Sequence, residues 1–529
     1  MAPFLPPECL QEIFINLVDD IPTLNSIIFV NKTWFENGIQ ILWRKPFSYD
    51  NDWNNLYKII PIYLSFLSKE TKDKLEIHET SLSIKPSKDY ISFIRELDLY
   101  NLIMQLCEWM VKSKYINTIP RILIENENDG LELICQEITE KISLKRTMNI
   151  IKEIMMIISK NSKINHLEIT MGNMDSVVFD YLDYEYFSDI FNSIPSNWFK
   201  KISNLEYDGQ YLLQKFTDHA INIDTLSFGF HTFIPDFIPS ISSLISVQKN
   251  LVNLELYLGY YDNEISKINI LEIISTLTKT CVNSLKSLSL ASGGDAIVQN
   301  VKELEMLSQC NHLERLHLRN IEFTMFNQDN FLIEFSSLIS LELFDVRMIS
   351  QYSEDYLVKL IEQIMKNSKL INLDLEPFIG DKYFTLVEFI PRYCSNLIEL
   401  TLKINDSYEN IMITILSILP FLNKLRILRI TEDWGGIQLD GEEYINQLSL
   451  TLPKQLQFFN VTGLLFSDEY LKPFLEKCCL NLKQVIILLK NYDDKHEQII
   501  KSFSLERKKV IKDIFVSTDH RPEITINWR

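Results

Sequence analysis

The sequence is poor in the features that define several protein classes. Its 529 residues include only 13 glycines and 8 cysteines, and no stretch approaches the 18 or so consecutive apolar residues of a membrane helix. The cysteines form no C-x-x-C pair and no dense disulfide framework, which favours a reducing compartment, the cytoplasm or the nucleus. The first ten residues carry Glu8 and three prolines in place of a basic start and an apolar run. We therefore expect neither a membrane span nor a secretory signal.

Positive charge is scarce as well. The chain has 52 Lys and Arg against 71 Asp and Glu, a net charge of -19, which argues against nucleic acid as a partner because phosphate binding needs clustered basic residues. Phosphate-binding loops and the H-E-x-x-H and G-x-S-x-G motifs are missing, and the eight histidines are scattered without nearby ligands. The sequence thus predicts a non-catalytic protein with no cofactor, no metal and a protein as its partner.

The first 46 residues predict three short helices. Two prolines, Pro6 and Pro7, precede apolar residues at helical spacing, and Asp19 to Pro22 end this first helix. We expect Thr23 to cap a second helix that runs toward Val30, and a third helix from Thr33 to Trp43. About forty residues cannot bury a core unaided. Something else must cover the apolar faces of these helices.

This segment resembles the F-box, the three-helix module with which substrate receptors dock onto the Skp-type adaptor of cullin ubiquitin ligases. The resemblance covers residues 4–46 and rests on Leu5-Pro6, Glu8, Leu10, Ile13, Leu17, Leu24, Val30, Trp34 and Leu42-Trp43-Arg44. It implies adaptor contacts by Leu5, Pro6, Glu8, Leu10, Ile13, Leu17, Val30 and Trp34. Where the family usually has basic residues between its middle Val and Trp, this chain has Asn31-Lys32-Thr33. The alternative is that the helices only cap the domain that follows, in which case Leu5, Leu10 and Ile13 would be buried against it.

Residues 47–90 predict a helical linker. Apolar residues recur at helical spacing from Leu56 to Leu67, and the charged segment Lys69 to Lys74 should end this helix. Packing of the linker on both neighbours would fix their relative orientation.

Residues 91–529 are dominated by an internal repeat, L-x-x-L-x-L. It occurs in fifteen windows, which begin at Ile94, Ile119, Ile164, Ile202, Ile223, Leu251, Leu285, Leu313, Leu338, Leu370, Leu397, Leu425, Leu456, Leu482 and Ile511. The mean step after Ile202 is roughly 28 residues, in the leucine-rich-repeat range. Each window predicts a strand that buries alternate residues, and helical spacing between windows, as in Tyr352 to Met365, predicts one helix per repeat. We expect an α/β solenoid of about 15 repeats, a horseshoe with parallel strands on its concave face and helices on its convex face, similar to the F-box leucine-rich-repeat proteins.

The residues between the buried leucines should line the concave face. Its first half is acidic, with Glu96, Asp98, Glu125, Glu168, Glu206, Asp208 and Glu255. Farther along, three basic side chains share one strand, and an Arg pair can grip a carboxylate or phosphate at two points. We predict a binding site for an acidic or phosphorylated element of a substrate, formed by Arg315, His317, Arg319, Lys403 and Arg429 with the aromatic Tyr257 and Phe344. Alternatively, Glu342 and the neighbouring repeats neutralise these cations within the fold.

Together these patterns predict a non-catalytic substrate-recognition subunit of a Skp–cullin–F-box ubiquitin ligase. Its F-box would bind the adaptor and, through it, a cullin, and its repeats would bind the protein to be ubiquitinated. The alternative is a leucine-rich-repeat scaffold or inhibitor that binds a partner without any ligase role.

Overall fold

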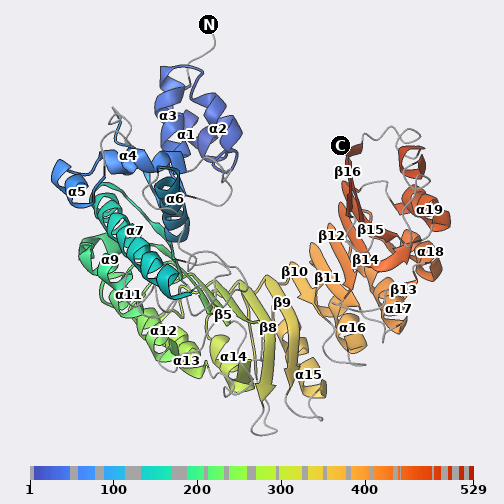
Figure 1. Cartoon of the computed structure of the whole chain (residues 1–529). Coiled ribbons are helices and arrows are strands. Elements are labelled where there is room, and N and C mark those ends of the chain that lie inside the picture. The colour runs from blue at the N-terminus through green and yellow to red at the C-terminus, as the bar shows by residue number, and fades with distance from the viewer. Residues whose placement is uncertain are drawn as a thin grey trace. The chain divides into compact units, whose positions relative to one another are not determined.

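The computed structural model describes most of the chain, which forms two compact units, Met1–Gly259 and Tyr260–Arg529 (Figure 1). The described residues are 5–47, 57–77, 88–113, 133–169, 187–207, 212–230, 237–258, 270–293, 297–324, 332–348, 354–376, 383–404, 409–432, 439–440, 442–466, 468–478, 482–489, 498–502, 511–517 and 523–528. Among them, no helix combines the length and the apolar character that crossing a bilayer requires.

The first unit begins with three helices, α1 (Pro7–Ile15), α2 (Ile21–Ile27) and α3 (Lys32–Leu42). Helix α1 starts on a proline, as predicted. Thr23 is not the cap of α2: the Asp20 carboxylate caps it by accepting the Thr23 backbone N–H, because an aspartate just before a helix can reach the exposed amides of its first turn. The Asn31 side chain caps α3 in the same way.

The linker contains more helix than predicted. Helix α4 (Ile60–Ser65) lies within the expected segment, but Lys69 to Lys74, predicted to end the helix, forms a second one, α5 (Lys69–Lys74). The Ser68 hydroxyl caps α5 by accepting the Thr71 N–H at 3.1 Å. The aromatic ring of Trp43, just after α3, stacks on Tyr90 with 4.4 Å between centroids and also contacts Tyr63 of α4. The linker thus packs against the three-helix segment.

Parallel strands form the sheet of the first unit. In chain order they are β1 (Glu96–Asp98), β2 (His166–Ile169), β3 (Asn204–Tyr207), β4 (Thr225–Phe230) and β5 (Asn253–Leu258). Their register aligns one leucine from each strand, and all are at most 1% exposed: Leu97, Leu167, Leu205, Leu226 and Leu254. Helices alternate with the strands along the chain: α6 (Leu99–Lys112), α7 (Leu133–Asn161), α9 (Ser188–Ser193), α10 (Ser196–Phe199), α11 (Leu213–His219) and α12 (Phe237–Ser246). A short 3-10 helix, Tyr90–Phe93, precedes β1.

The second unit repeats this plan. Its main parallel strands are β6 (Ser287–Ser292), β8 (Arg315–Thr324), β9 (Ser340–Met348), β10 (Asn372–Leu375), β11 (Glu399–Ile404), β12 (Ile427–Glu432), β14 (Phe458–Phe466) and β15 (Gln484–Leu489). The aligned and buried row reads Leu288, Leu316, Leu341, Leu373, Leu400, Leu428, Phe459 and Val485. Two short strands, β7 (Ile297–Asn300) and β13 (Leu439–Asp440), pair with the second halves of β8 and β14. The helices are α13 (Leu271–Thr280), α14 (Val301–Leu307), α15 (Glu354–Lys366), α16 (Tyr383–Tyr393), α17 (Glu409–Ile418), α18 (Glu442–Thr451) and α19 (Asp468–Cys478), with a 3-10 turn at Leu419–Phe421.

Thirteen of the fifteen predicted windows therefore form parallel strands, with the aligned row and intervening helices of a leucine-rich-repeat solenoid in each unit. The window at Ile119 lies outside the described residues. The last window forms a strand, β16 (Ile511–Ser517), but this strand does not pair with the preceding parallel strand as predicted. Instead β17 (Glu523–Trp528) lies between β15 and β16 and pairs antiparallel with both. The spacing of leucines predicts a strand with one buried face but not the neighbours of that strand, and antiparallel neighbours need no crossover helix. The horseshoe curvature stays a prediction.

Candidate protein-binding surfaces

The three-helix segment exposes several large apolar side chains. Three of those predicted to contact an adaptor are exposed, Leu5 at 45%, Ile13 at 47% and Val30 at 57%, and Phe29 beside Val30 reaches 84%. We call these four residues the exposed apolar set. Pro6 and Glu8, also predicted as contacts, are exposed too. The sequence did not predict that Phe29 is exposed, although this residue directly precedes the predicted contact Val30.

Other predicted adaptor contacts lie in the interior. Leu10 is 2% exposed and packs with Phe14, Leu24 and Ile27 in the core of the segment. Leu17 and Trp34 are partly buried against this core, and the Trp34 ring lies 5.4 Å from that of Phe14. Leu10 and Phe14 are four residues apart and share the inner face of α1. Leu10 thus belongs to the core of the segment, and the adaptor contact predicted for it stays a prediction.

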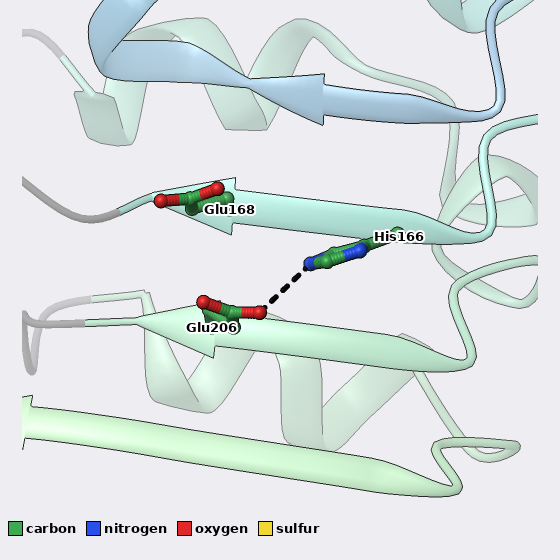
Figure 2. A group of neighbouring side chains, drawn as sticks. All are labelled: His166, Glu168 and Glu206. Carbon is green, nitrogen blue, oxygen red and sulfur yellow. Dashed lines mark hydrogen bonds and ion pairs between the residues drawn. The ribbon is translucent and has the colours of Figure 1, made fainter. Parts of the chain in front are cut away.

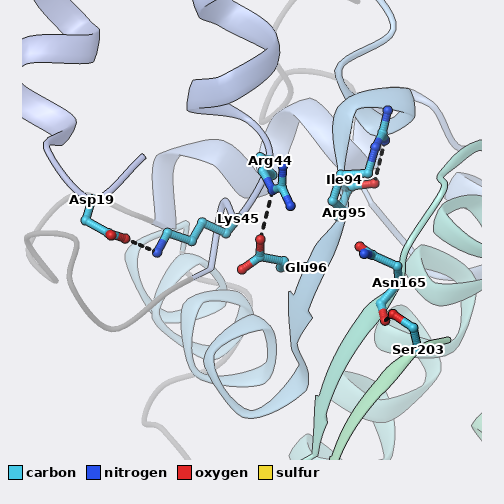
Figure 3. Close-up of polar contacts among 8 residues, drawn as sticks. All are labelled: Asp19, Arg44, Lys45, Ile94, Arg95, Glu96, Asn165 and Ser203. Atoms are coloured by element: carbon cyan, nitrogen blue, oxygen red, sulfur yellow. Dashed lines mark hydrogen bonds and ion pairs between the residues drawn. The ribbon is translucent and has the colours of Figure 1, made fainter. Parts of the chain in front are cut away.

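The end of α3 is joined to the first strand of the repeats (Figure 3). The backbone carbonyl of Arg44 accepts the N–H groups of Arg95 at 2.9 Å and Glu96 at 3.2 Å, and its side chain donates to the Glu96 carboxylate at 2.9 Å. The same double acceptance recurs one repeat on, where the Arg95 carbonyl accepts from Asn165 and His166. The chain at Arg44 therefore continues the pattern by which successive repeats are linked, and it covers the first edge of the sheet.

Capping and exposure thus coexist in the segment. Arg44 satisfies backbone donors at the sheet edge, while Leu5 and Ile13 stay nearly half exposed. A segment that only capped the repeats would bury both of these side chains. The two sequence-based alternatives for these helices are therefore not exclusive.

Six of the seven predicted substrate-binding residues lie on one face of the sheet of the second unit. We call this the outward face, the side of each strand opposite to its buried leucines. Arg315, His317 and Arg319 alternate with buried leucines on β8. The Arg315 Nε lies 3.3 Å from the Ser287 hydroxyl, and the His317 Nδ1 lies 3.2 Å from the Ser289 hydroxyl and 3.7 Å from the Glu342 carboxylate. These contacts join β8 to the strands on either side of it.

An aromatic ring stands between two of the cations on this face. The Phe344 centroid on β9 lies 4.5 Å from the Arg319 guanidinium carbon and 3.6 Å from the Lys403 Nζ. Cations at such distances are attracted by the ring quadrupole. Lys403 also pairs with Glu376 at 3.2 Å, and Arg429 pairs with Glu399. Carboxylates from neighbouring repeats therefore lie beside Lys403 and Arg429, an arrangement that the alternative interpretation predicts.

Negative charge is packed closely on the same face. Burial, followed by the repulsion of Glu342, raises the pKa of Asp374 on β10 to about 6. The surface is thus mixed in sign rather than uniformly basic. The seventh predicted residue, Tyr257, lies on β5 of the first unit, where it is 39% exposed.

The outward face of the first unit brings together a group that the sequence did not predict. The His166 ring on β2 points toward Glu206 on β3 (Figure 2), and the His166 Nε2 lies 3.0 Å from the Glu206 Oε1. That hydrogen bond is the main cause that raises the pKa of His166. Glu168 lies two residues farther along β2. The residues are up to 40 positions apart in the sequence, but the alignment of repeats places Glu168 directly opposite Glu206. Aligning the L-x-x-L-x-L windows that begin at Ile164 and Ile202 would therefore have predicted that these two carboxylates are neighbours. Of the other predicted acidic residues, Glu125 and Asp208 lie outside the described residues.

An acid beside this group is almost fully covered. Asp98 on β1 is 7% exposed and caps α6 by accepting the Asn101 N–H at 2.8 Å. Burial first, and then the charge of Glu168, raise the pKa of Asp98 to about 7. The acidity predicted for this half of the surface is therefore concentrated at β1 to β3.

Comparison with known proteins finds 61 matching chains among solved structures. No protein-family model and no curated protein matches the chain. Solved structures that it resembles include the leucine-rich-repeat-containing protein LegL7 of Legionella pneumophila, with 15% identity over 60% of this chain and 94% of that chain and a TM-score of 0.30. Another is an internalin, inlF, of Listeria monocytogenes, with 17% identity over 59% of this chain and 87% of that chain and a TM-score of 0.30. The leucine-rich-repeat assignment rests on the aligned strands of the chain itself.

Proposed function

We propose that this chain is the non-catalytic substrate-recognition subunit of a Skp–cullin–F-box ubiquitin ligase. In this proposal residues 4–46 form the F-box, which docks a Skp-type adaptor, and residues 91–529 bind the protein to be ubiquitinated. Residues 47–90 join these two parts. The chemistry of ubiquitin transfer would belong to its partners in the cytoplasm or nucleus.

The main support for the proposal is the exposed apolar set. It lies on a segment that otherwise has its own core and is hydrogen-bonded to the first strand of the repeats. Soluble proteins seldom leave several large apolar side chains uncovered within so few residues unless a partner covers them. Leu5, Ile13, Phe29 and Val30 remain exposed although the segment has a core around Leu10 and Phe14 and Arg44 bonds to Glu96 of β1. The resemblance to the F-box supplies the kind of partner.

Co-purification of the full chain with a Skp-type adaptor tests this proposal. We expect a stoichiometric complex with the wild type, and its loss in a Pro6→Ala/Ile13→Asp double variant. Phe421→Asp is the control, because Phe421 is another large apolar side chain, 63% exposed, in the second unit. Absence of a complex with the wild type, or a loss shared by the control, would contradict adaptor docking through these helices.

For the target, we propose that Arg315 and Arg319 bind an acidic or phosphorylated element of the target protein at the outward face of β8. Both side chains are exposed, and Phe344 holds Arg319 beside Lys403. His317, Lys403 and Arg429 contribute less net charge because each is close to a carboxylate. Reversing both arginines to glutamate should weaken target capture strongly, whereas Lys424→Glu, at an exposed site before β12, should not. Unchanged capture by the double reversal would refute this assignment.

The second candidate function is a leucine-rich-repeat scaffold or inhibitor with no ligase role. The carbonyl of Arg44, which continues the repeat pattern, favours it because a terminal repeat needs a cap in any solenoid. This candidate predicts target binding without any adaptor complex.

A further inference from the structure

We propose that His166, Glu168 and Glu206 form a binding site for a divalent transition-metal ion on the outward face of the first unit. One ligand atom from each side chain can be chosen so that all three lie within 4.8 Å of one another. The side chains are half-buried, so they keep access to solvent. This inference does not depend on the ligase role.

The backbone builds the group. His166 and Glu168 are two residues apart on β2, so both point to the same side of the sheet. Glu206 stands opposite Glu168 on the neighbouring parallel strand, about 4.8 Å away in the hydrogen-bonding direction. Ligands on paired strands are held more firmly than ligands on loops.

The spacing is close to that of two coordination bonds. Imidazole nitrogen and carboxylate oxygen bind Zn²⁺ at about 2.0 to 2.2 Å in a tetrahedral arrangement, so two such ligands lie about 3.4 Å apart. The His166 Nε2 and Glu206 Oε1 are 3.0 Å apart in the structure. Rotation of the half-buried Glu168 side chain would bring the third ligand in, and the remaining positions would hold water or a side chain of a bound protein.

Charge and ligand type select the class of ion. Two carboxylates and a neutral imidazole carry a charge of about -2, and the imidazole favours Zn²⁺, Co²⁺, Ni²⁺ or Fe²⁺ over Mg²⁺ or Ca²⁺. The charges that act on His166 come from Glu206, Glu96 and Glu168, all carboxylates. A bound cation would relieve their mutual repulsion.

Titration of the full chain with Co²⁺, followed by its visible absorption, tests the site. We expect one saturable equivalent with oxygen and nitrogen ligands. Both His166→Gln and Glu206→Gln should weaken binding by about tenfold or more. His317→Gln is the matched control, because it changes a histidine that also faces a glutamate, at 3.7 Å, in the second unit.

The melting temperature of each variant without metal separates loss of the site from loss of the fold, and only the wild type and the control should gain stability from Co²⁺. No saturable binding would overturn the proposal. So would an equal loss in His317→Gln, binding retained by both site variants, or a thiolate-to-cobalt absorption band from a cysteine such as the exposed Cys9.

Discussion

The three-helix segment and the repeats treat apolar side chains in opposite ways. In the repeats, the aligned leucines are at most 1% exposed and charged residues such as Arg315 and Glu342 face outward. In the segment, the exposed apolar set remains outside a small core around Phe14. Each repeat brings its own helix to cover its leucine, whereas about forty residues cannot cover all of their apolar surface. The repeats therefore cover their own leucines, and the exposed apolar set supports the proposal that a partner covers the segment.

Truncating one apolar side chain to alanine in the repeats and one in the three-helix segment should give the largest difference in the free energy of unfolding. Leu316→Ala removes a buried side chain from the β8 row and should lower the free energy of unfolding by about 2 to 5 kcal/mol. Ile13→Ala, at a side chain that is nearly half exposed, should change it by less than about 0.5 kcal/mol. Urea denaturation of the two variants and the wild type measures both. Equal losses would mean that Ile13 is part of a core, and the comparison would fail.

Overfilling the core of the segment should cost somewhat less. A Cβ at Gly38 on α3 would lie 3.1 Å from Ile27 Cγ2 and 3.3 Å from Ile28 Cγ2. Gly38→Val should therefore destabilise the segment by about 1 to 3 kcal/mol. Lys32→Val, at an exposed position of the same helix, controls for helix propensity. Loss of protection from hydrogen exchange should be confined to α1 to α3. Neutral behaviour of Gly38→Val would show that α2 and α3 do not approach so closely.

Asp98 differs from most outward charges of the repeats, because it is buried. Its pKa is about 7 in the folded chain against an ordinary value of 3.8. Between these values the folded state holds a proton that the unfolded state has released, so the stability of the fold should fall as the pH rises from about 4 to 7. Asp98→Asn keeps a good helix cap and removes the charge.

The variant should therefore be more stable than the wild type at pH 8 and about equal to it at pH 4, as thermal unfolding at the two values would show. Asp20 caps α2, but its pKa is lowered by its hydrogen bonds to Thr23. Asp20→Asn should thus show the opposite sign, with any loss at neutral pH disappearing in acid. Identical pH profiles for the Asp98 variant and the wild type would contradict the burial of this charge.

The smallest effect concerns Phe344, an apolar ring on the outward face that cations flank instead of a helix. Phe344→Leu keeps the apolar bulk and removes the attraction of the ring for Lys403 and Arg319, worth about 0.5 to 1 kcal/mol for an exposed pair. Comparison with Phe344→Leu in a Lys403→Met background isolates the coupling. A coupling near zero would show that the ring does not hold Lys403.

The strands of the repeats could be predicted from the sequence more fully than the candidate binding surfaces. The leucine spacing predicted where strands lie, because burial of alternate residues marks each strand directly. It could not predict the reversed direction of β17 or the pairing of β7 with β8, which depend on tertiary neighbours. The same limit applies to the sites: the placement of Leu10 inside and Ile13 outside, and the meeting of His166 with Glu206, are set by packing between elements.

Adaptor docking through the three-helix segment can be tested by calorimetry of the full chain with a Skp-type adaptor, for the wild type, Ile13→Asp and Phe421→Asp. We expect a one-to-one complex that Phe421→Asp preserves and Ile13→Asp weakens by at least about a hundredfold, since a buried apolar anchor of an interface contributes about 2 kcal/mol or more and a charge at that place adds a desolvation cost. An affinity that Ile13→Asp leaves unchanged, or a wild type that does not bind, would contradict adaptor docking through this segment.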